Sequence, residues 1–375
     1  MPPLARRNLF HDKVRLSVTL TGIVFAVVLI VVQVGLFLGF TSSTAALIEH
    51  SRADLWVTSA HVPYLEQGAL FSERKLYQVL ATPGVASAEK LLTDWGRWKR
   101  PDGGTESPFI VGFNLDNPLG GPWNLVEGSL ADLNVADSVI IDTLYKQKLG
   151  VTRVGQVVEI NGHRARVVGF TRGIRSFTTS PYVFTSFKNA QNFNVRARED
   201  QTTFVLVKVA PGADIRAVQR ELRARLRDAE VYTSGEFSRM TTAYWMFTTG
   251  AGVAVLLAAV LGLVVGVVIV AQTIYATTMD HIREFGTLKA IGASNRYIYR
   301  VIIRQAVISA LIGYALAMLV SVFVVRGSRE GGAAILLPWE LTAGMFVLTL
   351  LMCIGASLVS INKVTRIDPA MVFKG

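Results

Sequence analysis

The sequence has little cysteine and histidine, and it lacks the short motifs that mark many enzymes. The single cysteine, Cys353, lies in an apolar run, so no internal disulfide framework can form and a buried packing role is expected. There is no H-E-x-x-H, no G-x-S-x-G, no paired Cys and His at metal-ligand spacing, and no G-x-x-x-x-G-K-[ST] phosphate loop. We therefore expect no catalytic residue, no metal site and no cofactor bound by this chain.

Acidic residues are fewer than basic ones, with 27 Asp+Glu against 38 Lys+Arg and a formal net charge of +11. Residues 41–243 hold 24 of the basic and 21 of the acidic residues, so most of the excess lies outside this segment. No pattern of aromatic residues accompanies the basic ones. A nucleic-acid partner is therefore not expected.

Long hydrophobic runs are what the sequence has in abundance. The mean hydropathy of +0.41 is too high for an ordinary soluble protein. A bilayer core needs about 20 apolar residues per helix. We expect spans at 16–40, 244–272, 300–325 and 341–362. The first is too long, and wrongly flanked, for a cleaved signal peptide. The pattern predicts a membrane α-helical protein with four transmembrane helices, one followed by three.

Basic residues flank these spans unevenly. They gather in residues 1–15, 273–299 and 363–375, whereas the segment 326–340 is charge-balanced. Lysine and arginine favour the cytoplasmic side. We therefore expect a multi-pass protein of the cytoplasmic (inner) membrane with both termini in the cytoplasm. Residues 41–243 and the short loop 326–340 would lie outside.

The large external segment has mixed helix and strand patterns. Helices are expected after Ser72 and over residues 213–228, the latter with Ile215, Val218, Leu222 and Leu226 on one face. Asn161-Gly162 predicts a tight hairpin turn. Helix–strand material lies near both ends of the segment. We therefore expect an α+β extracytoplasmic domain built from both ends, with a small β-rich subdomain inserted at about 126–187.

Isolated polar residues in this segment have ordinary interpretations. His50, His61 and His163 are spaced as surface or turn residues rather than as ligands. A run of arginines is typical of a solvated helix face, although it could serve an acidic partner, and it comprises Arg220, Arg223, Arg225 and Arg227.

The stretch "HIREFGTLKAIGASNRYIYR", residues 281–300, separates the second and third spans. Aliphatic or aromatic residues recur every third position from Ile282, which predicts a short amphipathic helix. Gly292 suits its C-terminal turn, and Ser294 can cap the next helix. One interpretation is a connector that lies on lipid headgroups. A docking element for a partner protein is the other.

Three stretches resemble one family. "REFGTLKAIGAS" resembles the cytoplasmic loop of FtsX/MacB-type ABC transporter permeases, and "INKVTRIDPAMVFKG" resembles their C-terminal end. Residues 8–37 are similar to the N-terminus of the DevC-type exporter permeases in particular. The order of one span, a large external domain and three spans is also the family's topology.

The resemblance implies a homodimeric permease subunit that binds two copies of a separate ABC ATPase subunit. ATP and Mg would be held by that partner. Some members of the family carry the ATPase fused at the N-terminus, whereas only 15 residues precede the first span here. The positions that match the coupling motif are Arg283, Glu284, Phe285, Gly286, Leu288, Lys289, Ala290, Ile291, Gly292 and Ala293. Phe285 stands where the family usually has an aliphatic residue.

Helix length suggests a mechanism. Residues 241–279 contain no charge and would form a continuous helix about 58 Å long, well above the bilayer thickness. We expect this helix to act as a lever between the corner and the external domain. Gln33 and Gln305 are the clearest polar residues in the spans, which does not suggest a hydrophilic channel. A substrate taken from the outer leaflet or periplasm is therefore favoured.

Two functions remain open, together with one structural question. The first function is export of a lipid or other amphiphile with a periplasmic adaptor, with or without an outer-membrane channel. The second is a non-transporting regulatory complex that controls an external cell-wall hydrolase. An external segment of about 200 residues favours export. A membrane-anchored enzyme is disfavoured because no site motif is present. Gly262 and Gly266 could form a dimer seam or pack against the first or fourth span of the same copy.

Overall fold

The computed structural model describes residues 13–179, 181–194, 197–280, 286, 287, 289, 291, 293–328 and 335–365. Their contacts divide the chain into two compact units. The helical unit comprises residues 1–38, 253–329 and 333–375, and the α+β domain comprises residues 39–252 and 330–332.

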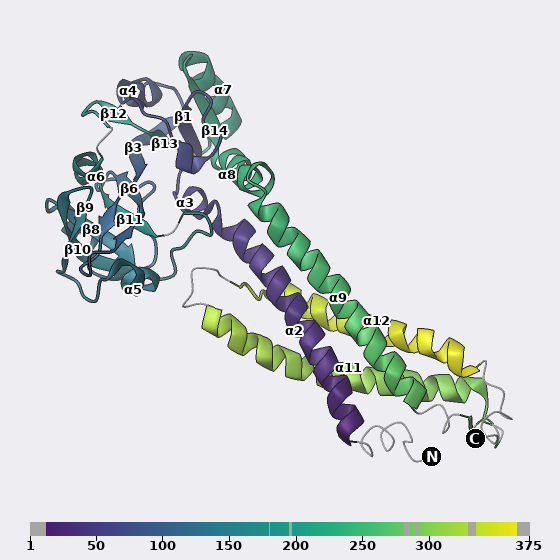
Figure 1. Ribbon diagram of the computed structural model, residues 1–375. Helices are drawn as coiled ribbons and strands as arrows, with labels where there is room; N and C mark the ends of the chain where they lie inside the picture. The colour runs from purple at the N-terminus through teal and green to yellow at the C-terminus, as the bar shows by residue number, and fades with distance from the viewer. Residues whose placement is uncertain are drawn as a thin grey trace. The chain divides into compact units, whose positions relative to one another are not determined.

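Four long helices dominate the chain outside the α+β fold (Figure 1): α2 (Lys13–Ser43), α9 (Ala251–Asp280), α11 (Asn295–Ser328) and α12 (Trp339–Thr365). Each contains a segment that is long and apolar enough to cross a bilayer: Leu16–Ser43, Ala251–Asp280, Asn295–Ser328 and Trp339–Leu358. The order of one span, a large domain and three spans is therefore confirmed. The helix of the second span begins at Ala251 and that of the third at Asn295, whereas the exact bounds of the spans in the bilayer stay predictions.

Small and aliphatic residues form the core of the helical unit. The buried cluster includes Ile23 and Ile30 of α2, Val270 of α9, Ala310 of α11 and Cys353 of α12. Helices in lipid pack closely where small residues let backbones approach. Cys353 is fully buried in this cluster, so its expected role as a packing residue is confirmed.

The expected continuous helix over residues 241–279 is wrong. Helix α8 (Ser234–Ala243) is followed by a π-helical turn, η4 (Tyr244–Thr248), and only then does α9 begin. Gly250 has a φ of +74°, which is a left-handed conformation that ends a helix and that glycine adopts readily. The Thr249 hydroxyl accepts a hydrogen bond from Ala251 N (3.2 Å) and so starts the new helix. The 30 residues of α9 span about 45 Å.

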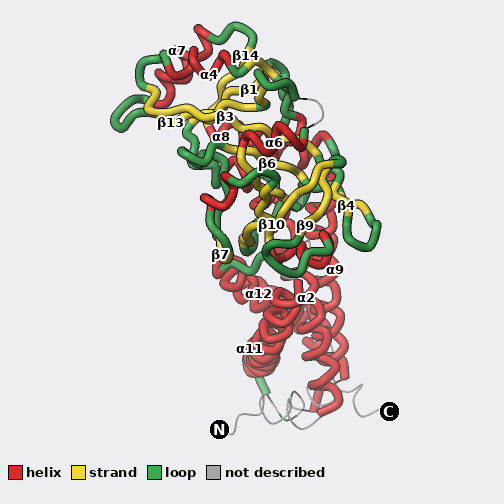
Figure 2. The backbone as a smooth tube through the Cα atoms, turned by 90° about the vertical axis from the view of Figure 1, so that its left-hand side faces the viewer, coloured by secondary structure: helices red, strands yellow, loops and turns green. Residues whose placement is uncertain are grey.

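Short helices of the α+β domain connect its strands. They are α3 (Ala46–Glu49), η1 (Leu65–Gln67), α4 (Arg74–Leu80), η2 (Leu130–Asn134), η3 (Thr143–Tyr145), α5 (Lys146–Leu149), α6 (Phe187–Phe193), α7 (Ile215–Arg225), α8 and η4. Figure 2 shows α4, α6, α7 and α8 beside the strands. The strands are β1 (Leu55–Ser59), β2 (Phe71–Ser72), β3 (Val85–Trp95), β4 (Trp98–Lys99), β5 (Thr105–Glu106), β6 (Phe109–Phe113), β7 (Leu125–Glu127), β8 (Ser138–Asp142), β9 (Val157–Ile160), β10 (His163–Thr171), β11 (Tyr182–Ser186), β12 (Gln201–Thr202), β13 (Phe204–Val209) and β14 (Ala229–Thr233).

One sheet runs through the domain in the order β14-β1-β13-β3-β6-β11-β8-β10-β9-β4-β5, with β7 paired to β10. Its first four strands come from both ends of the domain, since β1 lies between β13 and β14 and β3 pairs with β13. The expectation of a domain built from both ends of the segment is therefore confirmed. The short strands β2 and β12 pair separately.

The β-rich insert is not a separate subdomain sheet, which corrects the expectation for residues 126–187. Strands β8–β11 do lie in that range, but they extend the same sheet. The reason is the length of β3. Its residues up to Leu91 pair with β13, and those from Leu91 to Trp95 pair with β6 on the other edge. One long strand thus joins both halves.

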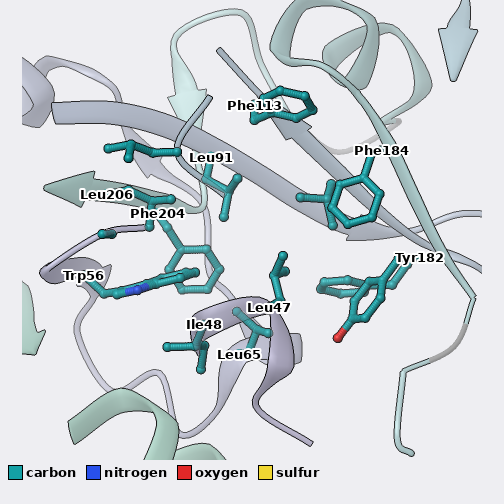
Figure 3. Close-up of a cluster of buried hydrophobic side chains, with 14 of the residues drawn as sticks. Leu47, Ile48, Trp56, Leu65, Leu91, Phe113, Tyr182, Phe184, Phe204 and Leu206 are labelled. Atoms are coloured by element: carbon teal, nitrogen blue, oxygen red, sulfur yellow. The ribbon is translucent and has the colours of Figure 1, made fainter. Parts of the chain in front are cut away.

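Alternating side chains give the first half of the sheet two apolar faces. Leu55 and Val57 pack toward α4 and α7, whereas Trp56 packs into a second cluster with Phe204 and Leu206. A strand places successive side chains on opposite faces. Figure 3 shows Trp56 and Phe204 together with Leu47 and Leu65, which come from α3 and η1. Both faces of this sheet are therefore covered by helices.

The local turn predictions are largely confirmed. Asn161 and Gly162 both have positive φ (52° and 85°) between β9 and β10, as the tight hairpin turn requires. Of the predicted apolar face of α7, Val218, Leu222 and Leu226 are buried, whereas Ile215 in the first turn is 38% exposed. The Ser72 cap is only partly right. Glu73 occupies the N-cap position of α4, while the Ser72 hydroxyl accepts a 3.4 Å hydrogen bond from Arg74 N.

Candidate functional site: the corner between α9 and α11

The corner is the segment between the end of α9 at Asp280 and the start of α11 at Asn295. Four of the ten motif positions are described: Gly286, Lys289, Ile291 and Ala293. The other six lie outside the described residues, namely Arg283, Glu284, Phe285, Leu288, Ala290 and Gly292. Ile282, where the amphipathic pattern begins, also lies outside them. The amphipathic pattern of the whole stretch therefore stays a prediction.

The described part of the corner has one helical turn and an exposed aliphatic residue. Gly286 and Thr287 are helical, and Ile291 N donates to Thr287 O at 3.1 Å. Gly286 is buried, whereas the Ile291 side chain is 79% exposed. A branched aliphatic side chain in this position can be buried by an apolar contact with a partner.

Ser294 begins α11 as expected. Its backbone carbonyl accepts a hydrogen bond from Tyr297 N (2.9 Å), and its hydroxyl lies 3.4 Å from the same nitrogen. A serine at this position satisfies backbone N–H groups that have no partner within the helix. The third span is therefore continuous with the end of the corner.

An apolar cluster anchors the first turns of α11. Ile298, Val301 and Ile302 are buried together, and Met279 near the end of α9 packs against them. This contact ties both sides of the corner to each other within the helical unit.

Three arginines on α11 form an exposed stripe that the sequence analysis above did not predict. Arg296, Arg300 and Arg304 are all exposed and follow at intervals of four residues. Residues four apart lie on one helix face. The stripe begins two residues after Ser294, so it extends the corner with positive charge. Its spacing in the sequence was the available signal.

The two glycines of α9 face α2 of the same chain. A Cβ at Gly266 would lie 2.8 Å from Ile30 Cδ1, and one at Gly262 would lie 3.0 Å from Gln33 Cγ. This is the geometry of packing against the first span, which was the alternative to a dimer seam. The seam itself stays a prediction.

The isolated polar residues of the α+β domain have local structural roles. The His50 ring stacks on Trp123 (centroids 4.3 Å apart), and His61 has a φ of +63° in a turn. His163 begins β10 opposite Ile160. Arg223 and Arg225 of α7 pair with Glu236 and Glu221. Among the described residues, no group of three or more His, Cys, Asp and Glu side chains could hold a metal ion.

Four apolar helices, with an α+β domain inserted in the sequence between the first and the second, define a multi-pass membrane protein with a helix–corner–helix element. Two family models then match nearly the whole chain. Residues 16–225 match the MacB-like periplasmic core domain, and residues 232–369 match the FtsX-like permease C-terminal region. The chain therefore belongs to the MacB/FtsX-like family of ABC transporter permeases.

Curated relatives agree with this membership. The chain is 25% identical over 381 residues to an uncharacterized ABC transporter permease of Mycobacterium tuberculosis (strain ATCC 25618 / H37Rv), with 99% of each chain covered. It is 21% identical over 235 residues to an uncharacterized ABC transporter permease of Methanocaldococcus jannaschii, covering 60% of this chain and 58% of the relative.

Solved structures of similar domains cover about half of the chain. The periplasmic region of MacB from Actinobacillus actinomycetemcomitans aligns with a TM-score of 0.39 and 12% identity, over 50% of this chain and 92% of that one. The extracellular domain of the transporter YknZ from Gram-positive bacteria aligns with a TM-score of 0.36 and 14% identity, over 48% of this chain and 98% of that one.

Proposed function

We propose that the chain is the permease subunit of an ABC exporter that couples ATP hydrolysis by a separate ATPase subunit to movement of its α+β domain. The observation that carries this proposal is the corner, where an exposed Ile291 precedes a capped, arginine-lined helix start. ATP and Mg would be held by the partner. Two permease copies would bind two ATPase subunits at their corners.

The chemistry of the corner suits a protein partner. Ile291 offers apolar surface, and the neighbouring Arg296 and Arg300 offer positive charge. Protein interfaces combine an apolar centre with a charged rim in this way. The six motif residues outside the described part of the chain would complete the contact.

Lipid or another amphiphile is the proposed cargo, taken up outside the cytoplasm with a periplasmic adaptor and, where present, an outer-membrane channel. The four spans are mostly apolar and do not suggest a hydrophilic channel, which supports this choice over conduction of a polar solute. Both termini and the corner would face the cytoplasm, in a cytoplasmic (inner) membrane location.

Docking is tested by Ile291→Asp in the full chain in lipid nanodiscs. A carboxylate buried at an apolar contact would lose its hydration without a partner charge. We expect at least a tenfold loss of affinity for the cognate ATPase subunit, measured by titration. Val135→Asp is the matched control, because Val135 is 60% exposed in the α+β domain. Wild-type affinity of the Ile291 variant would refute docking at this corner.

Cargo is tested with the same nanodiscs by following ATP-dependent release of a fluorescent lipid to acceptor vesicles. Release supports export. An ATP-dependent movement of the α+β domain with no release would instead support a regulatory complex that acts on an external hydrolase.

A further inference from the structure

The break between α8 and α9 is held in place by aromatic and polar contacts inside the α+β domain. The Tyr64 ring stacks on Tyr244 of the π-helical turn, with centroids 3.9 Å apart. Leu65 N donates to the Thr241 hydroxyl at 3.2 Å, just before the turn. The turn that leads into α9 is therefore attached to η1, which lies 176 residues earlier in the sequence.

Glu66 of η1 is the acceptor on which three donors converge. Its Oε2 accepts from Trp245 Nε1 of the π-helical turn (3.2 Å). Its Oε1 accepts from the hydroxyls of Thr179 (2.9 Å) and Thr178 (3.3 Å). An indole N–H can only donate, so the carboxylate is its natural partner. Burial raises the pKa of Glu66, although these hydrogen bonds act in the opposite direction.

The segment around Thr178 and Thr179 also reaches the end of the first span. Phe177 N donates to the Ser43 hydroxyl (3.2 Å), and its ring packs edge-on against Phe40, with centroids 5.0 Å apart. At the other end of this segment, Ile174 N donates to Asp142 Oδ2 of β8 (2.7 Å). One short segment therefore contacts the last turns of α2, the sheet and Glu66.

We propose that Glu66 holds the π-helical turn, the end of α2 and the sheet together, so that they move as one body. We call this set of contacts the joint and Glu66 its pin. This inference rests on the proposed function, because it assigns the route by which a displacement of α9 would reach the α+β domain. Glu66 and Trp245 are positioning residues in this joint.

The local backbone supports a joint at this place. Single π-helical turns inside helices occur frequently at functional sites. Gly250 follows the turn with a φ of +74°, and a Cβ there would meet nothing within 4 Å. The fixed turn is thus followed by a residue with free space around it. The turn itself stays attached through Trp245, so Gly250 marks where the attached segment ends and α9 begins.

Four variants distinguish the proposed role of Glu66 from a general loss of stability of the α+β domain. Glu66→Met removes all three acceptor contacts, and Trp245→Phe removes the indole donor alone. Glu66→Gln is the conservative variant. Its carbonyl can still accept from Trp245, while its NH₂ group donates to the threonine hydroxyls. The control is Glu49→Met, which removes a 2.9 Å contact with the Ser238 hydroxyl elsewhere in the same domain.

The first measurement is amide hydrogen exchange of the full chain in nanodiscs without nucleotide. We expect residues 174–179 and 244–248 to exchange at least tenfold faster in Glu66→Met, because the three hydrogen bonds that Glu66 accepts are lost. Glu66→Gln should stay within about threefold of wild type, as should Glu49→Met in these segments. Unchanged exchange in Glu66→Met would overturn the pin.

The second measurement compares the exchange pattern of the α+β domain in complexes with ADP and in complexes trapped with ATP and vanadate. Wild type and Glu66→Gln should respond to the nucleotide, whereas Glu66→Met and Trp245→Phe should not, at equal ATPase binding. A wild-type response in Glu66→Met would refute the joint. If wild type itself does not respond, the proposed function fails, and the nucleotide-free comparison alone decides whether Glu66 pins the turn.

Discussion

At the scale of single residues, Glu236 in the first turn of α8 links this helix to α7. Its carboxylate accepts from Thr233 N (2.9 Å) in the capping box of α8 and from Gln219 Nε2 of α7 (2.6 Å), and it pairs with Arg216. Burial would raise the pKa of Glu236, but Arg216, the Thr233 N–H and Gln219 lower it to about 2. The carboxylate is therefore ionised in the folded state well below its usual pKa of about 4.5.

This shift predicts a specific loss of stability in acid. A depressed folded-state pKa gives stability that is present above about pH 4.5 and is lost as the pH falls toward about 2. Glu236→Gln should be about 1 kcal/mol less stable than wild type at neutral pH, since one carboxylate contact set is weakened at a partly exposed site. The difference should shrink across the acid window, as measured by chemical unfolding followed by tryptophan fluorescence.

Glu221→Gln is the control for this prediction. Glu221 pairs with Arg225 one turn away on the exposed face of α7. Such pairs contribute about 0.3–0.5 kcal/mol. An acid dependence of the Glu221 variant as large as that of the Glu236 variant would contradict the assignment.

At the scale of elements, the glycines of α9 determine how closely it approaches α2. A Cβ at Gly266 would lie 2.8 Å from Ile30 Cδ1 and 3.3 Å from Ala26 O, and the backbone atom cannot move aside. Gly355 of α12 has no atom within 4 Å of its Cβ position. The two glycines therefore differ in packing although both lie in apolar helices.

We predict that Gly266→Leu destabilises the helical unit by about 1–3 kcal/mol through overpacking. Gly355→Leu should change stability by less than about 0.5 kcal/mol, because it points into open space. Thermal unfolding of the full chain in nanodiscs measures both. Equal melting temperatures for the two variants would show that α2 does not lie against Gly266 in the bilayer.

At the scale of the whole molecule, the distribution of charge predicts how the chain is inserted. Ser294 at the corner and Ser107 in the α+β domain are both exposed in the structure, so each can report on its side of the membrane. Cys353 is fully buried and is first replaced by alanine.

A cysteine at Ser107 should react with a membrane-impermeant thiol reagent in intact cells, whereas one at Ser294 should react only after the membrane is opened. The positive-inside distribution is the physical reason. Labelling of the Ser294 site from outside would reverse the proposed topology, and the corner could then not meet a cytoplasmic ATPase.

Elements whose sequence signals are local could be predicted before the structure was known. Long apolar runs predicted the four spans, because a helix satisfies its own backbone hydrogen bonds in hydrocarbon. The sequence also predicted the Asn161-Gly162 turn, the apolar face of α7 and the Ser294 cap, since each depends on neighbouring residues. The corner motif was visible too, although six of its residues lie outside the described part of the chain.

Features that depend on residues far apart in the sequence could not be predicted in this way and are seen only in the folded chain. A run without charge at 241–279 looks continuous, and nothing local in it shows that Glu66 and Tyr64 hold a π-helical turn there. Likewise, β3 joins the two halves of the sheet because its two ends pair with strands far apart in the sequence. Hydropathy depends on each residue's own preference for water or an apolar environment. Strand pairing and the contacts that hold the π-helical turn depend on residues that come together only when the chain folds.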